Sequence, residues 1–330
     1  MSACFPDAET MRTALTLAAR APSVHNTQPW RWRVGENSIH LYSNPSLQLH
    51  GTDPDSRDLM ISCGISLNHC VVAFAALGWL AKVHRFPNPA DTSHLAAIEL
   101  EPYPAVKVDI ALAEAIPHRR TDRRHYSSRP VSIGDIALMG ARAARAGVML
   151  RKVEALTHLS LLVAQAAEQH TRSYEYLSEL STWSGRYASL AGVPARNTPQ
   201  LDPAAAIPRR VFAGSALAES RKAPPAFDNA VVLALGTRDD DDLARLRAGE
   251  ATSLVLLTAT ALGLASCPIT EPLEIVKIRA GVRTDVFGTS GYPQMLLRIG
   301  WAPVDAEPLL EAPRRPLSDV VTQLDGTSFN

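Results

Sequence analysis

The stretch 59–81 is the feature that most constrains the fold, because its 23 residues carry no formal charge. A run of that length could form a transmembrane helix. However, the stretch contains Asn68 and His69, it has no aromatic belt at both ends, and Asp55 and Asp58 precede it as residues typical of a helix start. We therefore expect a buried core helix in a protein without a membrane partner.

A second long apolar segment, at 249–266, aligns with the first at an offset of 185 residues. Gly64 matches Gly249 in this alignment, and the Ala-Leu-Gly sequence that begins at Ala76 recurs at Ala261. Earlier in each half, the residues around Arg20 match those around Arg145 at an offset of 125, both at the end of a helix. The repeated order predicts an internally duplicated protein with a first half at 1–112 and a second half at 113–330.

The two offsets differ by 60 residues, which predicts an insertion in the second half, at about 154–227. Its first part is amphipathic and helical, whereas 184–225 is rich in Pro, Ala, Gly, Ser and Arg. Irregular segments of this length are uncommon in compact domains unless they serve as lids, partner arms or linkers. A lid over a site and a mobile surface excursion both remain open at this point.

The hydrophobic periodicity predicts an α+β fold. Helices are expected at 7–21, 56–80, 109–120, 132–147, 155–180, 239–264 and 273–281, and strands at 30–34, 38–42, 81–86, 95–100, 148–153, 230–235 and 294–301. The acidic run 239–242 is typical of a helix's first turn, so we assign it no cation. Two similar halves could pack as the subunits of a homodimer do, and we expect a monomer with this pseudo-dimer symmetry.

Composition narrows the class of protein. Lys+Arg and Asp+Glu both total 33, so the formal net charge is zero and no overall positive electrostatic field would attract nucleic acid. The four cysteines are too scattered for a disulfide framework, and Cys63, His69 and Cys70 lack a second ligand pair, so no metal is expected. The N-terminus has neither the basic nor the apolar region of a signal peptide, which favours a cytoplasmic protein.

The segment 20–32, with the sequence RAPSVHNTQPWRW, is a polar loop between a predicted helix and a Trp-rich strand. Pro22 ends the helix, and Pro29 forces an extended path toward the strand. Ser23, Asn26 and Gln28 supply donors and acceptors. From the residues alone, a site and an ordinary connecting loop are equally compatible with this pattern.

A second polar segment, 117–126, holds four arginines within six residues, together with Thr121. Guanidinium groups match phosphate oxygens, and the hydroxyl adds a donor. A solvated basic turn, or a surface salt bridge with Asp122, explains the composition equally well.

The loop at 21–30 resembles the A-P-S-x-x-N-x-Q-P-W signature of the nitroreductase superfamily of FMN-dependent enzymes. The run from Arg119 to Arg123 is similar to the R-R-S-x-R stretch with which that family holds the FMN phosphate and the flavin pyrimidine edge, with Thr121 in place of Ser. The segment 313–317 resembles the family's closing basic segment. The segment 267–271 resembles the one that lies over the isoalloxazine ring, although it could also be a plain turn.

The resemblance implies FMN as cofactor, with the backbone N–H of Thr270 directed at flavin N5. The implied cofactor-binding residues are Pro22, Ser23, Val24, Asn26, Arg119, Arg120, Thr121, Arg123, Ile269, Thr270, Arg314 and Arg315. No side chain is implied as a catalytic acid or base. Each motif occurs only once, and the motifs are divided between the two predicted halves. We therefore predict one complete FMN site and one lost FMN site.

Single-copy motifs and the long insertion most resemble the Acg-like branch of mycobacterial FMN-binding proteins. The resemblance implies a nitroreductase-like fold and an oxidoreductase that takes electrons from NAD(P)H by hydride transfer at flavin N5. Because a lid can seal the flavin in that branch, the alternative is an FMN storage or sequestering protein. Oxygen-dependent flavin fragmentation, known in a distant branch, is a third hypothesis. Motifs for dinucleotide binding, P-loop hydrolysis, zinc proteolysis and a serine nucleophile elbow do not occur.

Overall fold

The computed structural model of the protein describes residues 5–185, 189–220 and 228–329. The helices are α1 (Ala8–Ala18), α2 (Arg57–Ala76), α3 (Lys107–His118), α4 (Ile133–Arg145), α5 (Leu156–Thr171), α6 (Tyr174–Trp183), α7 (Asp242–Ala261), α8 (Val276–Val286) and α9 (Leu317–Val320). The strands are β1 (Trp30–Val34), β2 (Ile39–Ser43), β3 (Trp79–Arg85), β4 (His94–Pro102), β5 (Met149–Lys152), β6 (Val231–Thr237), β7 (Ala265–Ile269), β8 (Tyr292–Gly300) and β9 (Val321–Gln323). These elements confirm the α+β class.

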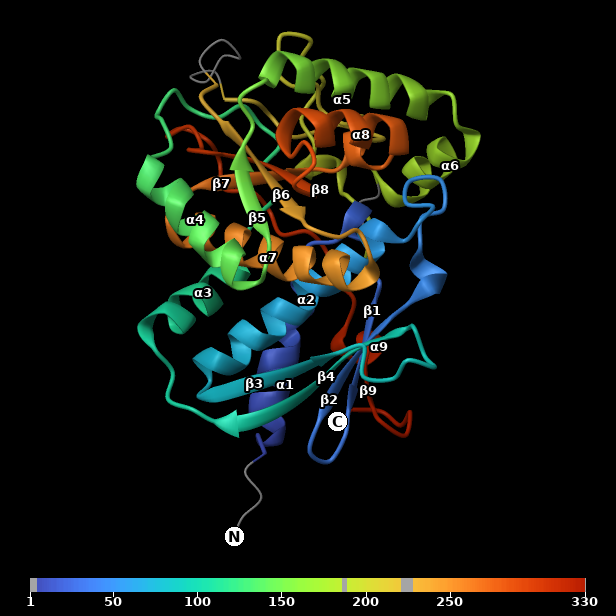
Figure 1. The fold of residues 1–330 in the computed structure, drawn as a ribbon, viewed down its shortest axis with the longest axis vertical. Coiled ribbons are helices and arrows are strands. Elements are labelled where there is room, and N and C mark those ends of the chain that lie inside the picture. Colours follow the sequence, from blue (N-terminus) through green and yellow to red (C-terminus); the bar gives the residue numbers. More distant parts are fainter. Residues whose placement is uncertain (1–4, 186–188, 221–227, 330) are drawn as a thin grey trace.

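Two sheets lie at opposite ends of the molecule, with helices between and around them (Figure 1). The first has the strand order β3-β4-β2-β1-β9, and the second has the order β5-β6-β8-β7. Apolar and charged residues alternate along β1, so one face of the strand packs on the core. Trp30 and Trp32 are buried there, whereas Arg31 between them is exposed.

The long apolar helices α2 and α7 pack against each other in the middle of the molecule (Figure 1). Gly64 and Gly249, which match in the predicted repeat, face each other where the helices cross. A Cβ atom on Gly64 would lie 2.1 Å from the Leu246 carbonyl oxygen, so the close approach requires glycine. Among the described helices, α2 alone is long and apolar enough to cross a membrane, and 83% of its apolar window is buried inside the protein. It is therefore the core helix that the sequence predicted.

The internal duplication and the 112/113 boundary stay predictions. Residue 112 lies inside α3, which contacts both α2 and α7. The chain also crosses between the halves at its C-terminal end, because β9 pairs in parallel with β1, with Val321 opposite Trp32. The segment 301–320 therefore runs from the second sheet back to the first.

The predicted insertion contains α5 and α6, and its described residues 189–220 are largely irregular. The expectation of one helix at 155–180 was wrong. Ser173 interrupts it because its hydroxyl accepts a hydrogen bond from the Tyr176 backbone N–H and caps a new helix. Residues 186–188 and the predicted end of the insertion, 221–227, lie outside the described residues.

Two strands were missed by the sequence prediction. β7 contains Pro268, which normally argues against a strand, but β7 is an edge strand and needs no donor on its open side. β9 has three residues and depends on a partner strand almost the whole chain away. The acidic run before α7 is a helix start, as expected: Asp241 accepts from the Ala244 backbone N–H, and Asp240 pairs with Arg279.

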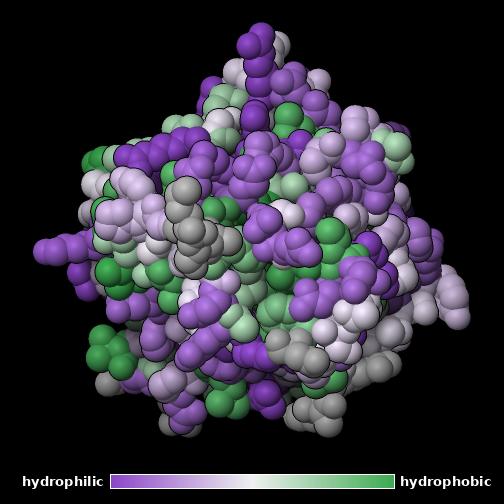
Figure 2. Space-filling view, turned by 90° about the horizontal axis from the view of Figure 1, so that it is seen from below, coloured by the Kyte–Doolittle hydropathy of each residue, from purple (hydrophilic) through white to green (hydrophobic). Residues whose placement is uncertain are grey.

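The surface at the end of the molecule that carries the N-terminus mixes polar and hydrophobic residues, as Figure 2 shows. In the part of the chain that the structure describes, no group of three His, Cys, Asp or Glu side chains could hold a metal ion. Cys63 instead donates to the Pro29 carbonyl oxygen, and His69 contacts Ser253.

Candidate functional site

A cavity of about 180 Å³ lies where the two halves, the insertion and the C-terminal segment meet. Its lining includes the loop after α1, one face of α2, the segment after α3, the end of β7 and residues of the insertion. All the cofactor-binding residues predicted from the sequence line this cavity except Arg315. The backbone N–H of Arg315 instead donates to the Gln28 side chain. The tertiary fold thus brings segments far apart in the sequence to one place, and their binding role stays a prediction.

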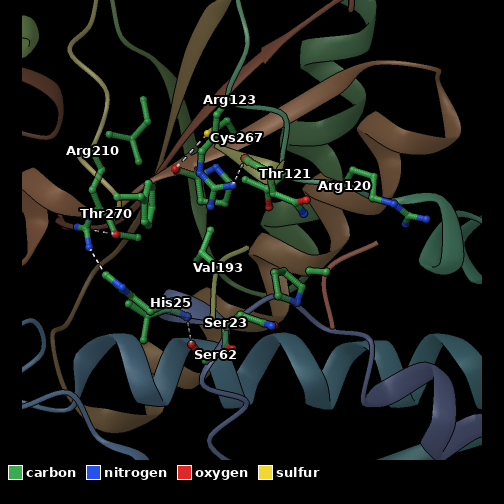
Figure 3. A pocket seen from close by; sticks show the side chains of 18 of the residues that line it. Ser23, His25, Ser62, Arg120, Thr121, Arg123, Val193, Arg210, Cys267 and Thr270 are labelled. Atoms are coloured by element: carbon green, nitrogen blue, oxygen red, sulfur yellow. Dashed lines mark hydrogen bonds between the residues drawn. The ribbon is translucent and has the colours of Figure 1, made fainter. Parts of the chain in front are cut away.

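The loop after α1 enters the cavity in a constrained backbone conformation. His25, Asn26 and Gln28 have positive φ angles of 45°, 56° and 57°, which are uncommon for residues other than glycine. Hydrogen bonds hold the conformation: the Ser23 hydroxyl accepts from the Gln28 N–H, and the Ser62 hydroxyl accepts from the Val24 N–H (Figure 3).

The Asn26 side chain connects this loop to two other parts of the site. Its amide nitrogen donates to the carbonyl oxygens of Gly192 in the insertion and Pro313 in the C-terminal segment. Its oxygen accepts from Arg314 at 3.0 Å. The asparagine of the motif therefore holds the cavity wall together.

Four arginines gather at one end of the cavity: Arg20, Arg119, Arg120 and Arg314. Arg119 is 6% exposed, and its one side-chain hydrogen bond within the described residues is a long contact of 3.5 Å to Thr121. Burial, followed by the charges of Arg314, Arg120 and Arg20, lowers the pKa of Arg119 to about 9.

Burial and then the charge of Arg20 also lower the pKa of Arg314 to about 10. Unlike Arg119, Arg314 donates to several protein acceptors, namely the Asn26 side chain and the carbonyl oxygens of Arg20, Ala312 and Pro313. Glu311 pairs with Arg20 and Arg120 at 2.7 and 2.9 Å, so one carboxylate serves two of the four cations. This end of the cavity is therefore suited to an anion with more than one charge. Arg20 was not among the predicted site residues, although its position directly before the Pro22 loop was a signal.

Most arginines of the segment after α3 line the cavity, but some of them also bind other groups of the protein. Arg120 is committed to the protein, because it donates to the carbonyl oxygens of Pro117 and Leu309 and pairs with Glu311. Figure 3 shows its guanidinium directed away from the other labelled side chains. Asp122 does form a salt bridge, with Arg124, but both side chains are buried, so the expectation of a surface salt bridge was wrong.

At the other side of the cavity lie Arg210, Thr270 and His25 (Figure 3). Arg210 belongs to the insertion and forms a buried ion pair with Glu274. It also donates to His25 Nε2 at 2.6 Å and to the Thr270 hydroxyl at 3.3 Å. Glu274 in turn accepts from the Thr270 hydroxyl at 2.7 Å.

The insertion covers the cavity. Gly192, Val193, Asn197, Ile207 and Phe212 contribute to its lining. The guanidinium of Arg123 donates to the Asn197 carbonyl oxygen at 3.1 Å and lies 4.9 Å from the centre of the Phe212 ring. Residues of the predicted insertion therefore form part of the cavity wall, and their action as a lid stays a prediction.

The sequence prediction missed many other cavity residues, among them His25, Asp58 and Arg210. His25 lies inside the recognised motif, but at a position that the motif leaves variable. Asp58 looked like an ordinary residue at a helix start. Arg210 lies in the Pro/Ala-rich segment, where no periodicity indicates which side chains turn inward.

Comparison with known proteins identifies the family. No protein-family model matches the chain. A Mycobacterium tuberculosis protein named "Putative NAD(P)H nitroreductase Rv3131" is 64% identical over 321 residues, which cover 97% of this chain and 93% of that protein. Another, named "Putative NAD(P)H nitroreductase acg", is 35% identical over 322 residues, covering 94% of this chain and 95% of that protein. The chain therefore belongs to the nitroreductase-like family that includes acg, which confirms the resemblance seen in its motifs.

Solved structures similar to the chain include a nitroreductase with bound FMN from Bacteroides fragilis, with a TM-score of 0.40 and 16% identity over 62% of this chain and 94% of that one. A BluB-like flavoprotein from Clostridium difficile has a TM-score of 0.41 and 14% identity over 64% of this chain and 98% of that one.

Proposed function

We propose that the protein binds FMN in this cavity and acts as a nitroreductase-like oxidoreductase with NAD(P)H as its electron donor. The observation that carries the proposal is the cluster of four arginines around the buried Arg119, whose cations outnumber the one carboxylate that pairs with them. Among the described residues, the Nε atoms of Arg119 and Arg314 are buried without a hydrogen-bond partner. A dianionic phosphate would supply the missing charge and acceptors.

The remaining residues fit the other parts of the cofactor. Ile61, Ile65 and Met295 give the cavity apolar walls for a ring system. Arg123, with its pKa lowered mainly by burial, offers a cation for the pyrimidine edge. By motif position, the backbone N–H of Thr270 would donate to flavin N5. When bound, FMN would supply two-electron hydride transfer between NAD(P)H and an acceptor.

The protein's own contribution is binding, orientation and exclusion of water. Arg119 and Arg314 would hold the phosphate. The hydrogen bonds of Asn26 connect its own loop with the insertion and the C-terminal segment. Asn197 and Phe212 of the insertion line the cavity and would help to exclude water from a bound flavin. Cytoplasmic location and the monomeric state stay predictions.

The contacts of the insertion at the cavity favour a second candidate function, an FMN storage or sequestering protein. Arg210 forms a buried ion pair with Glu274, and Phe212 lies in the cavity beside His25, with 5.8 Å between the ring centres. If the insertion stays closed, NAD(P)H and nitro substrates have no access to a bound flavin. The two functions therefore differ in whether the insertion opens.

An anaerobic visible spectrum of the purified protein, recorded before and after excess NADPH, tests both candidates, with dithionite as the chemical control. Bleaching of a yellow protein by NADPH would support the oxidoreductase. Bleaching by dithionite alone would support sequestration. A colourless protein that takes up no added FMN would refute both.

A further inference from the structure

Glu311 is a carboxylate at the arginine end of the cavity that no motif singled out. It lies in the C-terminal segment between β8 and α9 and lines the cavity. Its Oε1 atom is 2.7 Å from Arg20 and 2.9 Å from Arg120, so one carboxylate binds guanidinium groups from two distant parts of the chain. A negative charge therefore lies among the cations that the proposed function assigns to a phosphate.

The cluster has an outer part and an inner part, which differ in exposure. In the outer part, the side chain of Glu311 is 55% exposed, and those of Arg20 and Arg120 are 26% and 23% exposed. In the inner part, Arg119 is buried, and the Nε atoms of Arg119 and Arg314 have almost no contact with solvent. Glu311 therefore reaches both the cavity and the solvent, on the outer side of the inner arginines.

The two parts also differ in charge balance. The strongest charge effects on Arg119 all come from other arginines. On Arg314 they come from Arg20 and Arg120, with Glu311 as the opposing charge. Among the residues that the structure describes, the two inner guanidinium groups thus have no carboxylate partner, whereas the two outer ones share Glu311. The inner part is suited to a dianion, and the outer part is already partly neutralised.

FMN and FAD would bring different charges to this end of the cavity. The phosphate of FMN is a monoester, which carries nearly two negative charges above its second pKa of about 6. FAD has the same flavin, but its two phosphates form a diphosphate diester in which each phosphorus group carries a single negative charge. A monoester in the inner part would match both inner cations. A diphosphate would bring half of its charge there and extend its second phosphate toward the outer part.

A second phosphate beside Arg20 and Arg120 would meet the Glu311 carboxylate, and like charges at close range repel each other. It would also find both outer guanidinium groups already paired. We propose that Glu311 makes this end of the cavity accept a terminal phosphate and reject a diphosphate, so that the protein selects FMN over FAD. This inference rests on the proposed function for the placement of the phosphate.

The first test measures the Kd values of FMN and FAD for the flavin-free protein by isothermal titration calorimetry, at neutral pH and constant ionic strength. Wild-type protein should bind FMN more tightly. Glu311→Gln keeps an oxygen acceptor for the arginines but removes the charge. It should lower the ratio of the FAD Kd to the FMN Kd about 5- to 10-fold, as loss of one repulsion between partly exposed charges would.

Glu307→Gln is the matched control. Glu307 lies in the same C-terminal segment, is exposed and does not belong to the cavity lining. Its substitution removes the same charge from the protein, but not from the arginine cluster, so the ratio should stay as in the wild type. An unchanged ratio in Glu311→Gln, or an equal fall in Glu307→Gln, would overturn the proposal.

Inorganic phosphate and pyrophosphate test the same selectivity without flavin or adenosine. Glu311→Gln should raise the affinity for pyrophosphate about 5- to 10-fold and that for phosphate clearly less, whereas Glu307→Gln should leave the ratio of the two unchanged. This measurement decides the matter if the size of adenosine keeps FAD out of both proteins. Equal gains for the two anions in Glu311→Gln would refute the role of Glu311.

A failed selectivity and a failed function give different results. Wild-type protein that binds FMN and FAD equally well, or that keeps its preference in Glu311→Gln, would refute the selectivity alone. Wild-type protein that takes up no FMN would refute the proposed function itself.

Discussion

Replacement of Arg119 by Met should have opposite effects on stability and on FMN binding. Arg119 is buried among Arg20, Arg120 and Arg314, and the structure gives its side chain a single long hydrogen bond within the described residues. Methionine matches the arginine side chain as far as Nε and carries no charge. The substitution should therefore stabilise the ligand-free protein by removing electrostatic repulsion, and weaken FMN binding by removing phosphate contacts.

The magnitudes follow from the environment of Arg119. At about 1.4 kcal/mol per pKa unit, lowering the pKa from 12.5 to about 9 corresponds to roughly 5 kcal/mol of unfavourable free energy for the buried charge. Relaxation and water entry reduce this, so we expect a gain in the free energy of unfolding of about 1–3 kcal/mol. Loss of two charge-assisted hydrogen bonds to phosphate, each worth about 1.5–3 kcal/mol, should weaken FMN binding about 100-fold or more.

Denaturant unfolding of the FMN-free protein and titration of FMN by quenching of its fluorescence measure the two effects. Arg120→Met is the matched control, because Arg120 donates to Pro117 and Leu309 and pairs with Glu311. It should destabilise the FMN-free protein. If Arg119→Met also destabilises that protein, or binds FMN with wild-type affinity, the assignment of Arg119 to an anion site is refuted.

Two further predictions concern the lid and the helix crossing. Arg210→Met removes the contacts with Glu274, His25 and Thr270, so hydrogen exchange in residues 189–220 and the rate of bleaching by NADPH should both rise. Arg172→Met, at an exposed ion pair at the end of α5, should change neither. Unaltered exchange in Arg210→Met would contradict the idea that Arg210 holds this segment at the cavity. Gly64→Ala places a methyl group 2.1 Å from the Leu246 carbonyl oxygen and should lower the free energy of unfolding by about 3 kcal/mol or more. Gly140→Ala in α4, whose added methyl group has its nearest neighbour at 3.9 Å, should be neutral or slightly stabilising, and equal effects at the two positions would argue against the close crossing.

The sequence determined most of the helices and strands, because their periodicity is local. It also determined which segments form the candidate site, since each motif is contiguous: the loop from Pro22 to Asn26, the run from Arg119 to Arg123, and the segment around Thr270 all line the cavity. The match of Gly64 with Gly249 in the sequence indicated the two positions at which the long helices approach closely. The duplication itself stays a prediction.

Tertiary structure decided what surrounds each of those residues. Glu311 pairs with Arg20 across most of the chain, and Arg210 contacts His25 from the insertion. The charges of Glu274 and Arg210, from two other segments, act on the pKa of Asp58. Charge state depends on burial and on neighbours within a few ångströms, and these neighbours are distant in sequence. An aspartate at a helix start and a histidine in a loop are therefore ordinary residues in the sequence, and only the folded chain gives them a shared cavity.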